Sequence, residues 1–286
     1  MAVRIVTDSA SDIPMDLARE FNITVVPAYI IIDDKPHKGG VDITADEFYQ
    51  KLQAGGPLPT TAQPSVGDFT EAYQDLLDQG HSVISMHVSG KLSGTVNSAE
   101  QARAALGDEG AGRIEVVDSQ LASIPLGLMA LSAGRRAADA ESHSELAEQL
   151  RQELPRYHGL FLLDTLTYLQ KGGRIGKGQA FLGSVLNVKP ILTIQDGVVH
   201  PVERARSRSR GLARLVAMAQ ELAPVEDLAV VYSTEREDAE ALRDRLSSVA
   251  PPNGIVVARF GPALGTHIGP GGLGVALARA GDMPNP

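Results

Sequence analysis

The chain contains no cysteine and no tryptophan, and aromatic residues make up only 4% of it. Without cysteine there can be no disulfide, no thiolate nucleophile and no cysteine ligand for a metal. The scarcity of aromatic side chains disfavours single-stranded nucleic acid as a ligand, because such sites stack bases on aromatic rings. The lack of cysteine is compatible with a cytoplasmic location, which we expect for this protein.

Long hydrophobic runs are also absent. The run Leu160-Phe161-Leu162-Leu163 falls far short of the roughly 18 residues that span a bilayer. One residue after Met1 the chain continues with Val3-Arg4-Ile5-Val6, which has the pattern of a first strand rather than of a secretory leader. We therefore expect neither a secretion signal nor stable insertion into a membrane.

The net charge of −9, from 35 acidic and 26 basic residues, disfavours non-specific binding to nucleic acid or to anionic membranes. The seven histidines are scattered and lack the spacing of metal ligands. We expect no metal and no cofactor. At 286 residues and 43% hydrophobic content, the chain is long and apolar enough for two domains with separate cores.

Short apolar runs alternate with segments of helical periodicity, which is typical of β-α units on a parallel sheet. The pattern predicts an α/β protein with two α/β domains, residues 1–154 and 155–286, the first with a largely parallel sheet. Residues 24–32 have the pattern of a single strand and residues 180–186 that of a helix. Residues 261–274 form a glycine-rich segment.

Two local signals are stronger than the rest. Ser65 followed by Asp68 has the form of a capping box at the start of a helix. Asp196-Gly197 between alternating apolar runs predicts a hairpin.

The loop Ser89–Thr95 lies between a predicted strand and a predicted helix. Backbone N–H groups at the start of a helix favour an anion, and the hydroxyls of Ser93 and Thr95 add donors, so a carboxylate or a phosphate would both fit. The alternative is that one of these hydroxyls only caps the helix.

Two further loops contain polar groups. Thr61 precedes Pro64 in a loop that leads to a helix, and His267 is the one ionisable side chain in the glycine-dense stretch 265–272. A histidine can donate to an anion in either charge state, although a lone histidine is more often structural.

Taken in order, these loops resemble the DegV family along nearly the whole chain. The matching segments are 7–9 (Thr-Asp-Ser), 61–65 (Thr-Ala-Gln-Pro-Ser), 92–95 (Leu-Ser-Gly-Thr), 117–119 (Val-Asp-Ser), 168–175 (Tyr-Leu-Gln-Lys-Gly-Gly-Arg-Ile), 189–192 (Lys-Pro-Ile-Leu) and 265–271 (Gly-Thr-His-Ile-Gly-Pro-Gly). One departure is Ala62, where the family usually has a hydroxyl.

The resemblance implies a long-chain fatty acid, similar to palmitate or oleate, bound at the domain interface with its tail in an internal tunnel. It implies that Thr61, Ser93, Thr95 and His267 contact the carboxylate. It also implies a separate fatty acid kinase, to which the acid would be presented for acyl-phosphate formation, or a role in lipid transport and metabolism. The protein would then be a non-catalytic carrier.

Four arginines, at positions 204, 206, 208 and 210, alternate along the chain and would share one face of an extended segment. A solvated strand or helix start explains them without any function. A nucleic-acid regulator is a second interpretation, which the net charge and the few aromatic residues disfavour. Our hypothesis is that the partner kinase docks here, through Arg206 and Arg174.

Two enzymatic alternatives stay open. Ser93, His267 and Asp118 supply the residue types of a serine hydrolase, although Ser93 lacks the elbow sequence of the α/β hydrolases. Asp8 and Asp12 suggest a phosphotransfer enzyme for a small anionic substrate, but the position two after Asp8 holds Ala10, where dehalogenase-like enzymes require a second aspartate.

Overall fold

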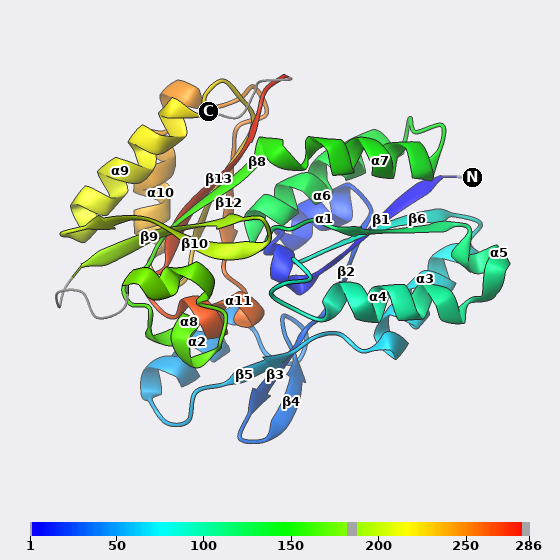
Figure 1. The fold of residues 1–286 in the computed structure, drawn as a ribbon, viewed down its shortest axis with the longest axis horizontal. Helices are drawn as coiled ribbons and strands as arrows, with labels where there is room; N and C mark the ends of the chain where they lie inside the picture. The colour runs from blue at the N-terminus through cyan, green and yellow to red at the C-terminus, as the bar shows by residue number, and fades with distance from the viewer. Residues whose placement is uncertain (1, 182–187, 282–286) are drawn as a thin grey trace.

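The computed structural model describes residues 2–181 and 188–281. Helices and sheets alternate across the molecule in five layers (Figure 1). The protein is therefore an α/β protein built on two main sheets, as the sequence pattern predicts.

The first sheet has the strand order β2-β1-β6-β7, and every pair in it is parallel. Its strands are β1 (Val3–Asp8), β2 (Ile23–Val26), β6 (Ser82–His87) and β7 (Ile114–Asp118). Burial on both faces explains why these strands read as continuous apolar runs. The predicted parallel sheet of the first half is confirmed.

The second sheet has the order β10-β9-β8-β13-β11-β12 and is mixed, with only β11 and β12 parallel. Its strands are β8 (Tyr157–Leu162), β9 (Lys189–Gln195), β10 (Val198–Ala205), β11 (Val225–Tyr232), β12 (Ile255–Arg259) and β13 (Leu273–Arg279). The chain changes from the first sheet to the second between β7 and β8. The boundary at residues 154 and 155 stays a prediction.

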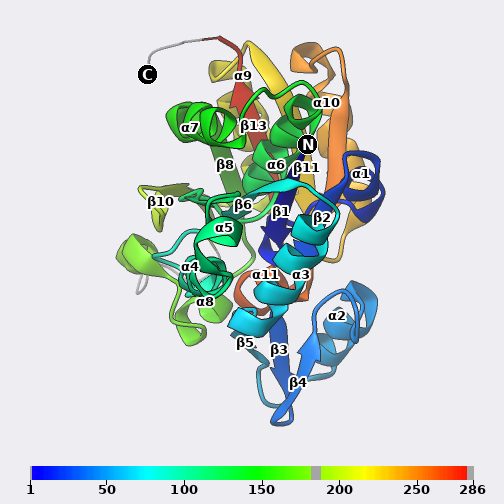
Figure 2. The ribbon, with the colours of Figure 1, turned by 90° about the vertical axis from the view of Figure 1, so that its right-hand side faces the viewer.

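Helix α6 (Ile124–Ala137) lies between the two sheets and packs on both (Figure 2). Its side chains share one hydrophobic core with the inner faces of β1, β6, β8 and β13. Successive side chains of β8 point to opposite faces of the second sheet. Phe161 packs inward, whereas Leu160 and Leu162 pack outward against α9 and α10.

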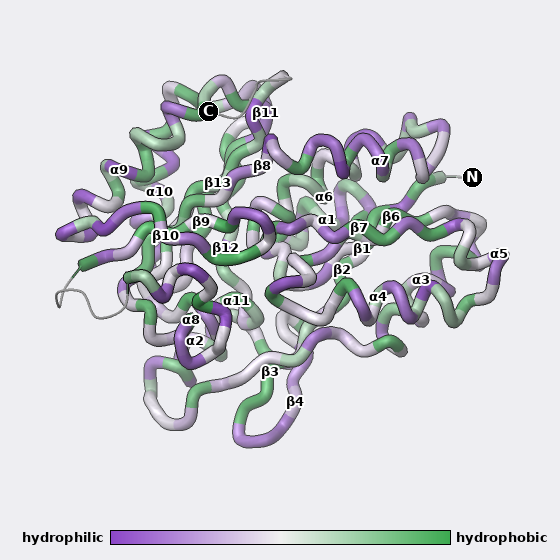
Figure 3. The backbone as a smooth tube through the Cα atoms, viewed as in Figure 1, coloured by the Kyte–Doolittle hydropathy of each residue, from purple (hydrophilic) through white to green (hydrophobic). Residues whose placement is uncertain are grey.

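Outer helices cover the far face of each sheet. The first sheet is covered by α3 (Val66–Asp78) and α4 (Thr95–Ala105), and the second by α9 (Arg208–Glu221) and α10 (Arg236–Arg245). Hydrophobic colour gathers along the central strands and alternates with hydrophilic colour along these helices, as amphipathic helices require (Figure 3).

The remaining helices are α1 (Met15–Glu20), α2 (Ala45–Ala54), α5 (Gly107–Ala111), α7 (His143–Glu153), α8 (Thr167–Lys171) and α11 (Pro262–Ile268), with 3-10 turns at residues 9–11, 154–156, 176–181 and 247–249.

A third, small sheet has the order β4-β3-β5 and packs with α2 and α11 on a minor core. Its strands are β3 (Tyr29–Ile32), β4 (Lys35–Lys38) and β5 (Thr60–Ala62). The prediction of one strand over residues 24–32 is therefore wrong. Pro27 divides the segment, because proline has no N–H for a ladder, and the two pieces join different sheets.

Both strong local signals are confirmed. Ser65 and Asp68 form a reciprocal capping box at the start of α3. Asp196 and Gly197 have φ values of 49° and 74°, the left-handed conformations of a two-residue hairpin turn between β9 and β10.

Two other expectations need correction. Residues 180 and 181 end a 3-10 turn, and the rest of the predicted helix, residues 182–186, lies outside the described residues. The glycine-rich segment 261–274 contains α11 and the start of β13, a central strand of the second sheet. Its glycines allow close packing rather than marking a loop: a Cβ at Gly274 would lie 2.8 Å from the ring of Phe161.

Candidate functional site

A cavity, called here the central cavity, lies between the two main sheets beyond the N-terminal end of α6. The space between its lining atoms, including the part open to solvent, is about 950 Å³. Its walls are mostly aliphatic. Apolar lining residues include Ala10, Val88, Leu92, Ala122, Phe161, Leu163, Leu169, Leu192, Ile194, Val199, Phe260, Leu264 and Ile268.

The first sheet explains the position of this cavity. From β1 the chain continues to β2 on one side, while β6 lies on the other, so the strand order reverses between β1 and β6. Ligands of open parallel sheets bind outside the carboxyl ends of strands at such a point. Asp8 ends β1 and Val88 follows β6, and both residues line the cavity.

Two hydrogen-bonded pairs form the polar end of the central cavity. Thr61 Oγ1 lies 3.1 Å from His267 Nε2, and Ser93 Oγ lies 2.8 Å from Thr95 Oγ1. All four side chains line the cavity. The structure therefore brings together the four residues that the family resemblance selects, although they come from β5, α11, the loop after β6 and the start of α4.

His267 is neutral at pH 7. Burial and, to a lesser extent, the nearby Arg174 guanidinium lower the pKa of its imidazole to about 4. Its Nδ1 is buried and, within the described residues, has no hydrogen-bond partner. A buried N–H without an acceptor is rarer than an unpaired acceptor, so we place the single proton on Nε2. Nε2–H then donates to Thr61 Oγ1, and the Thr61 hydroxyl hydrogen is free for another acceptor.

Ser93 is held in a similar way. The Thr95 N–H donates to Ser93 Oγ at 3.3 Å, so the serine oxygen accepts from the first residue of α4. The N-cap residue itself is Gly94, which has no side chain to cap the helix. A Cβ at Gly94 would lie 2.8 Å from Gln63 Nε2. This glycine therefore lets the loop of Thr61 approach the loop of Ser93, and it leaves the helix start open to an anion.

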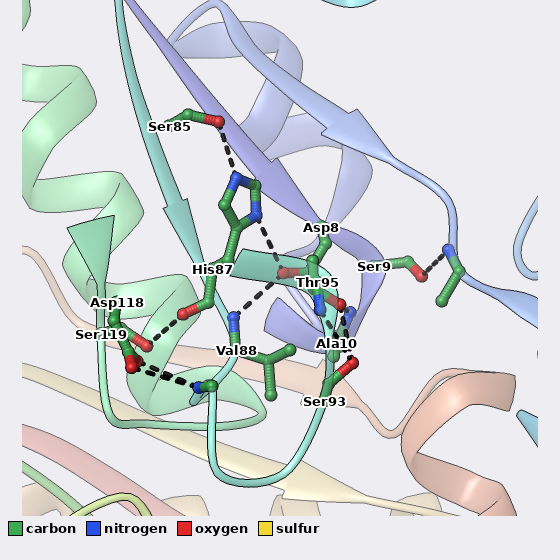
Figure 4. Close-up of polar contacts among 12 residues, drawn as sticks. Asp8, Ser9, Ala10, Ser85, His87, Val88, Ser93, Thr95, Asp118 and Ser119 are labelled. Atoms are coloured by element: carbon green, nitrogen blue, oxygen red, sulfur yellow. Dashed lines mark hydrogen bonds and ion pairs between the residues drawn. The ribbon is translucent and has the colours of Figure 1, made fainter. Parts of the chain in front are cut away.

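Beside these pairs, the Asp8 carboxylate connects the cavity to a buried chain of hydrogen bonds (Figure 4). Asp8 accepts from Ala10 N, from Val88 N and from His87 Nδ1 at 2.9, 3.0 and 3.1 Å. His87 Nε2 lies 2.7 Å from Ser85 Oγ, which also accepts from Tyr73 Oη at 2.8 Å.

This chain has the connectivity of a Ser-His-Asp triad but the opposite orientation. Asp8 lines the cavity, whereas Ser85 is 0% exposed in the core. A substrate in the cavity would meet the carboxylate rather than the serine. These hydrogen bonds fix the end of β1 against β6. The sequence did not predict this arrangement, because no neighbouring residue along the chain indicates that His87 is hydrogen-bonded to Asp8.

The serine hydrolase arrangement considered from the sequence is not assembled among the described residues. Ser93 and His267 are each hydrogen-bonded to a threonine, and Asp118 accepts from the backbone of Gly90 and Gln120 instead of orienting the histidine. Among the residues described, no group of acidic and histidine side chains is placed to hold a metal.

Asp12 serves the scaffold. Its carboxyl group accepts from Ser123 Oγ at 2.6 Å and from Gly261 N at 2.8 Å, which ties the turn after β1 to the starts of α6 and α11. Burial raises the pKa of Asp12 to about 8, against the opposing effect of these two hydrogen bonds.

The four alternating arginines do not share a face, because the extended segment ends at Ala205. Arg204 donates to Ala180 O and stacks on the Phe181 ring, whereas Arg208 begins α9 and pairs with Asp164 and Asp238. Arg206 and Arg210 are exposed. Arg174 has a different environment: it lines the central cavity, so sequence reasoning missed its place beside the polar end.

Comparison with known proteins gives a consistent result. A family model described as "Uncharacterised protein, DegV family" matches residues 2–280. A DegV domain-containing protein of Caldanaerobacter subterraneus is 35% identical over 276 residues, covering 96% of this chain and 97% of the relative. Protein DegV of Bacillus subtilis is 31% identical, covering 96% and 98% of the two chains.

Solved structures agree with this match. A DegV family protein from Thermus thermophilus, described by its fatty acid binding, has a TM-score of 0.88 at 36% identity, covering 97% of this chain and 99% of its own. DegV of Bacillus subtilis, described as a fatty acid binding protein, has a TM-score of 0.85 at 30% identity, with the same coverage. A stearic acid-binding protein from Eubacterium ventriosum has a TM-score of 0.88 at 26% identity, covering 96% and 97%.

The substitution Gly172→Ala tests the packing of the His267 ring at the polar end of the central cavity. A Cβ there would lie 2.2 Å from His267 Nδ1, so Gly172→Ala must displace the ring and break its bond to Thr61. We expect a loss of about 1–3 kcal/mol in the free energy of unfolding, typical of overpacking. Urea unfolding measures this, with Gly67→Ala as the control because a Cβ at Gly67 meets nothing closer than 3.6 Å. Equal stability of the two variants would contradict the packing.

The protonation of His267 is the second test. Because its folded pKa is about 4 and its ordinary value is 6.5, the neutral ring stabilises the fold fully above pH 6.5, and this contribution is lost as the pH falls towards 4. We expect the ring Cε1 proton, assigned with His267→Gln, to keep the shift of a neutral imidazole from pH 8 to pH 5.5. A midpoint near 6.5 in the NMR titration would show that the ring is not buried as described.

Proposed function

The chain belongs to the DegV family, and from this premise we propose that it binds a long-chain fatty acid in the central cavity. The observation that carries the proposal is the pairing of Thr61 with His267 and of Ser93 with Thr95 at one end of an apolar cavity between two sheets. The structural relatives described above as fatty acid-binding proteins support it.

The polar end suits a carboxylate better than a neutral head group. An ionised carboxylate only accepts hydrogen bonds, and burying it without donors is costly. When His267 Nε2–H donates to Thr61 Oγ1, and the Thr95 N–H and hydroxyl donate to Ser93 Oγ, the hydroxyl hydrogens of Thr61 and Ser93 are each left to donate to a ligand. The Arg174 guanidinium adds a positive charge beside them. Ala62 donates nothing, so Thr61 is the hydroxyl donor of its loop.

The apolar wall supplies most of the affinity. Burying a methylene is worth about 0.8 kcal/mol, so a chain of about 16 carbons gains on the order of 10 kcal/mol before the costs of ordering. Aliphatic side chains from both sheets line the path. The polar end therefore fixes the direction of the acid, while the tail determines how tightly it binds.

We further propose that the protein is a carrier without catalytic activity, which presents the acid to a separate kinase in the cytoplasm. The hydrogen bonds of Ser93 and His267 to threonines favour a carrier over a serine hydrolase. Arg206 is exposed on the connection from β10 to α9, and within the described residues it forms no ion pair. Arg206 and Arg174 are our candidates for contact with the kinase. No described helix could cross a membrane.

Native mass spectrometry with added palmitate tests the binding proposal. We expect one palmitate per chain, and about ten-fold weaker binding in Ser93→Ala, because a hydrogen bond to a charged group is lost. Ser209→Ala, at an exposed position of α9, is the matched control. No uptake of palmitate or oleate by the wild-type chain would refute the carrier, and unchanged affinity in Ser93→Ala would remove Ser93 from the head-group site.

Charge reversal tests the docking surface. We expect Arg206→Glu to slow phosphorylation of the bound acid by a cognate kinase while palmitate affinity stays unchanged. Arg245→Glu, at an exposed arginine near the end of α10, is the control for charge alone. Equal kinase rates for wild type and Arg206→Glu would refute the docking role.

A further inference from the structure

Three of the four proposed carboxylate contacts are fixed by regular secondary structure. Thr61 lies on β5, Thr95 begins α4 and His267 lies on α11. Ser93, the fourth, lies on the loop between β6 and α4. Loops move more than helices and strands unless other contacts hold them. The position of the Ser93 hydroxyl therefore depends on the contacts of its loop.

Ser89 organises this loop. Its carbonyl oxygen accepts from Leu92 N at 2.9 Å and from Ser93 N at 3.0 Å. Its own N–H donates to Leu121 O at 2.8 Å, which anchors it to the segment after β7. Ser89 is 0% exposed and is not among the residues that line the central cavity. It therefore holds the backbone of Ser93 without reaching the space proposed for the ligand.

The second sheet fixes the side chain of Ser89. The Ser89 hydroxyl donates at 2.8 Å to the carbonyl oxygen of Gly197, in the turn of the β9–β10 hairpin, and its oxygen accepts from Lys91 N at 3.2 Å. The Lys91 ammonium donates at 2.9 Å to the carbonyl oxygen of Asp196, the other turn residue. The hairpin lies at one edge of the second sheet. A turn of the second sheet thus holds the loop that leaves β6 of the first.

The contact between this turn and Ser89 is close and buried. Gly197 has a φ of 74°, and a Cβ there would lie 2.5 Å from Ser89 Oγ. Glycine therefore allows both the left-handed turn and the close approach of the hydroxyl. The hydrogen bond is buried, and removing one partner would leave the other unpaired away from water, which is costly. The hairpin and the loop are thereby held in one relative position.

We propose that Ser89 is a positioning residue for the fatty acid site, which couples the position of the β9–β10 hairpin to that of Ser93 and so directs the Ser93 hydroxyl at the carboxylate. This inference rests on the proposed function and adds to it a residue that does not contact the ligand. The same hairpin contributes Ile194 and Val199 to the apolar wall of the central cavity. One element of the second sheet then shapes the wall around the tail and also orients a donor for the head group.

A double-mutant cycle separates positioning from a general structural effect. Palmitate affinity is measured for Ser89→Ala, Ser93→Ala and the double variant by displacement of a fluorescent fatty acid, whose own affinity is first measured for each variant. We expect Ser89→Ala to weaken palmitate binding about five-fold when Ser93 is present, because the Ser93 donor is displaced. In the Ser93→Ala background we expect a change of less than about two-fold, because the hydroxyl that Ser89 positions is gone.

Gly197→Ala tests the same contact from the hairpin, so the test does not depend on the folding of Ser89→Ala. The added Cβ must displace the Ser89 hydroxyl, and we expect the same dependence on Ser93. Gly254→Ala is the matched control: Gly254 has a φ of 82°, and a Cβ there has no neighbour within 4 Å. It strains the backbone similarly without touching the loop, so palmitate affinity should equal that of the wild type. Circular dichroism checks that each variant is folded.

Two results would overturn the positioning role while fatty acid binding stands. One is an equal loss of palmitate affinity on Ser89→Ala with and without the Ser93 hydroxyl, because Ser89 would then act independently of Ser93. The other is an unchanged affinity in both Ser89→Ala and Gly197→Ala when Ser93 is present. Failure of the wild-type chain to bind palmitate would refute the proposed function itself, and the positioning role with it.

Discussion

The packing of two sheets on one buried helix is the constraint on which the rest of the structure depends. Helix α6 has eleven buried residues out of fourteen, and it fills the space between the sheets over its own length. Beyond its first turn the same space continues without a helix, and there the side chains of both sheets enclose the central cavity. The cavity is therefore a continuation of the core, which explains its aliphatic wall.

The same constraint explains why the polar end is assembled from distant parts of the chain. Thr61 lies on the small sheet, Ser93 on the loop after β6 and His267 on α11, and all reach the point where the two main sheets separate. Burial keeps the imidazole neutral, so it orients the Thr61 hydroxyl instead of adding a charge. Positive charge at the cavity is supplied by Arg174, which lines it together with these donors. The arrangement of an aliphatic wall with neutral donors and one cation suits an amphiphilic anion.

The sequence predicted those features that depend on interactions between residues close together along the chain. The capping box at Ser65 and the turn at Asp196-Gly197 depend on neighbours along the chain, and both were predicted. The parallel sheet followed from apolar runs that end in turns. The choice of Thr61, Ser93, Thr95 and His267 as candidate carboxylate contacts came from the ordered family resemblance, because each of those loops alone allows a structural interpretation.

The features that the sequence did not predict depend on contacts between distant parts of the chain. β13 contains Gly274 because the Phe161 ring packs closely on this position. In the sequence, this glycine made the start of a central strand look like the end of a glycine-rich loop. The strand predicted over residues 24–32 had the correct hydrophobicity, but its two parts pair in different sheets. The hydrogen bond between Asp8 and His87 joins residues 79 positions apart, and the place of Arg174 beside the cavity depends on a hydrogen bond to Leu92, 82 positions away along the chain.

A crystal structure of the chain with palmitate tests the central claim most directly. The account predicts that the tail lies between the two main sheets and that the carboxylate oxygens lie at hydrogen-bond distance, about 2.5–3.0 Å, from Thr61 Oγ1 and Ser93 Oγ. Palmitate bound outside the central cavity, or bound with its methyl end at these two hydroxyls, would contradict it.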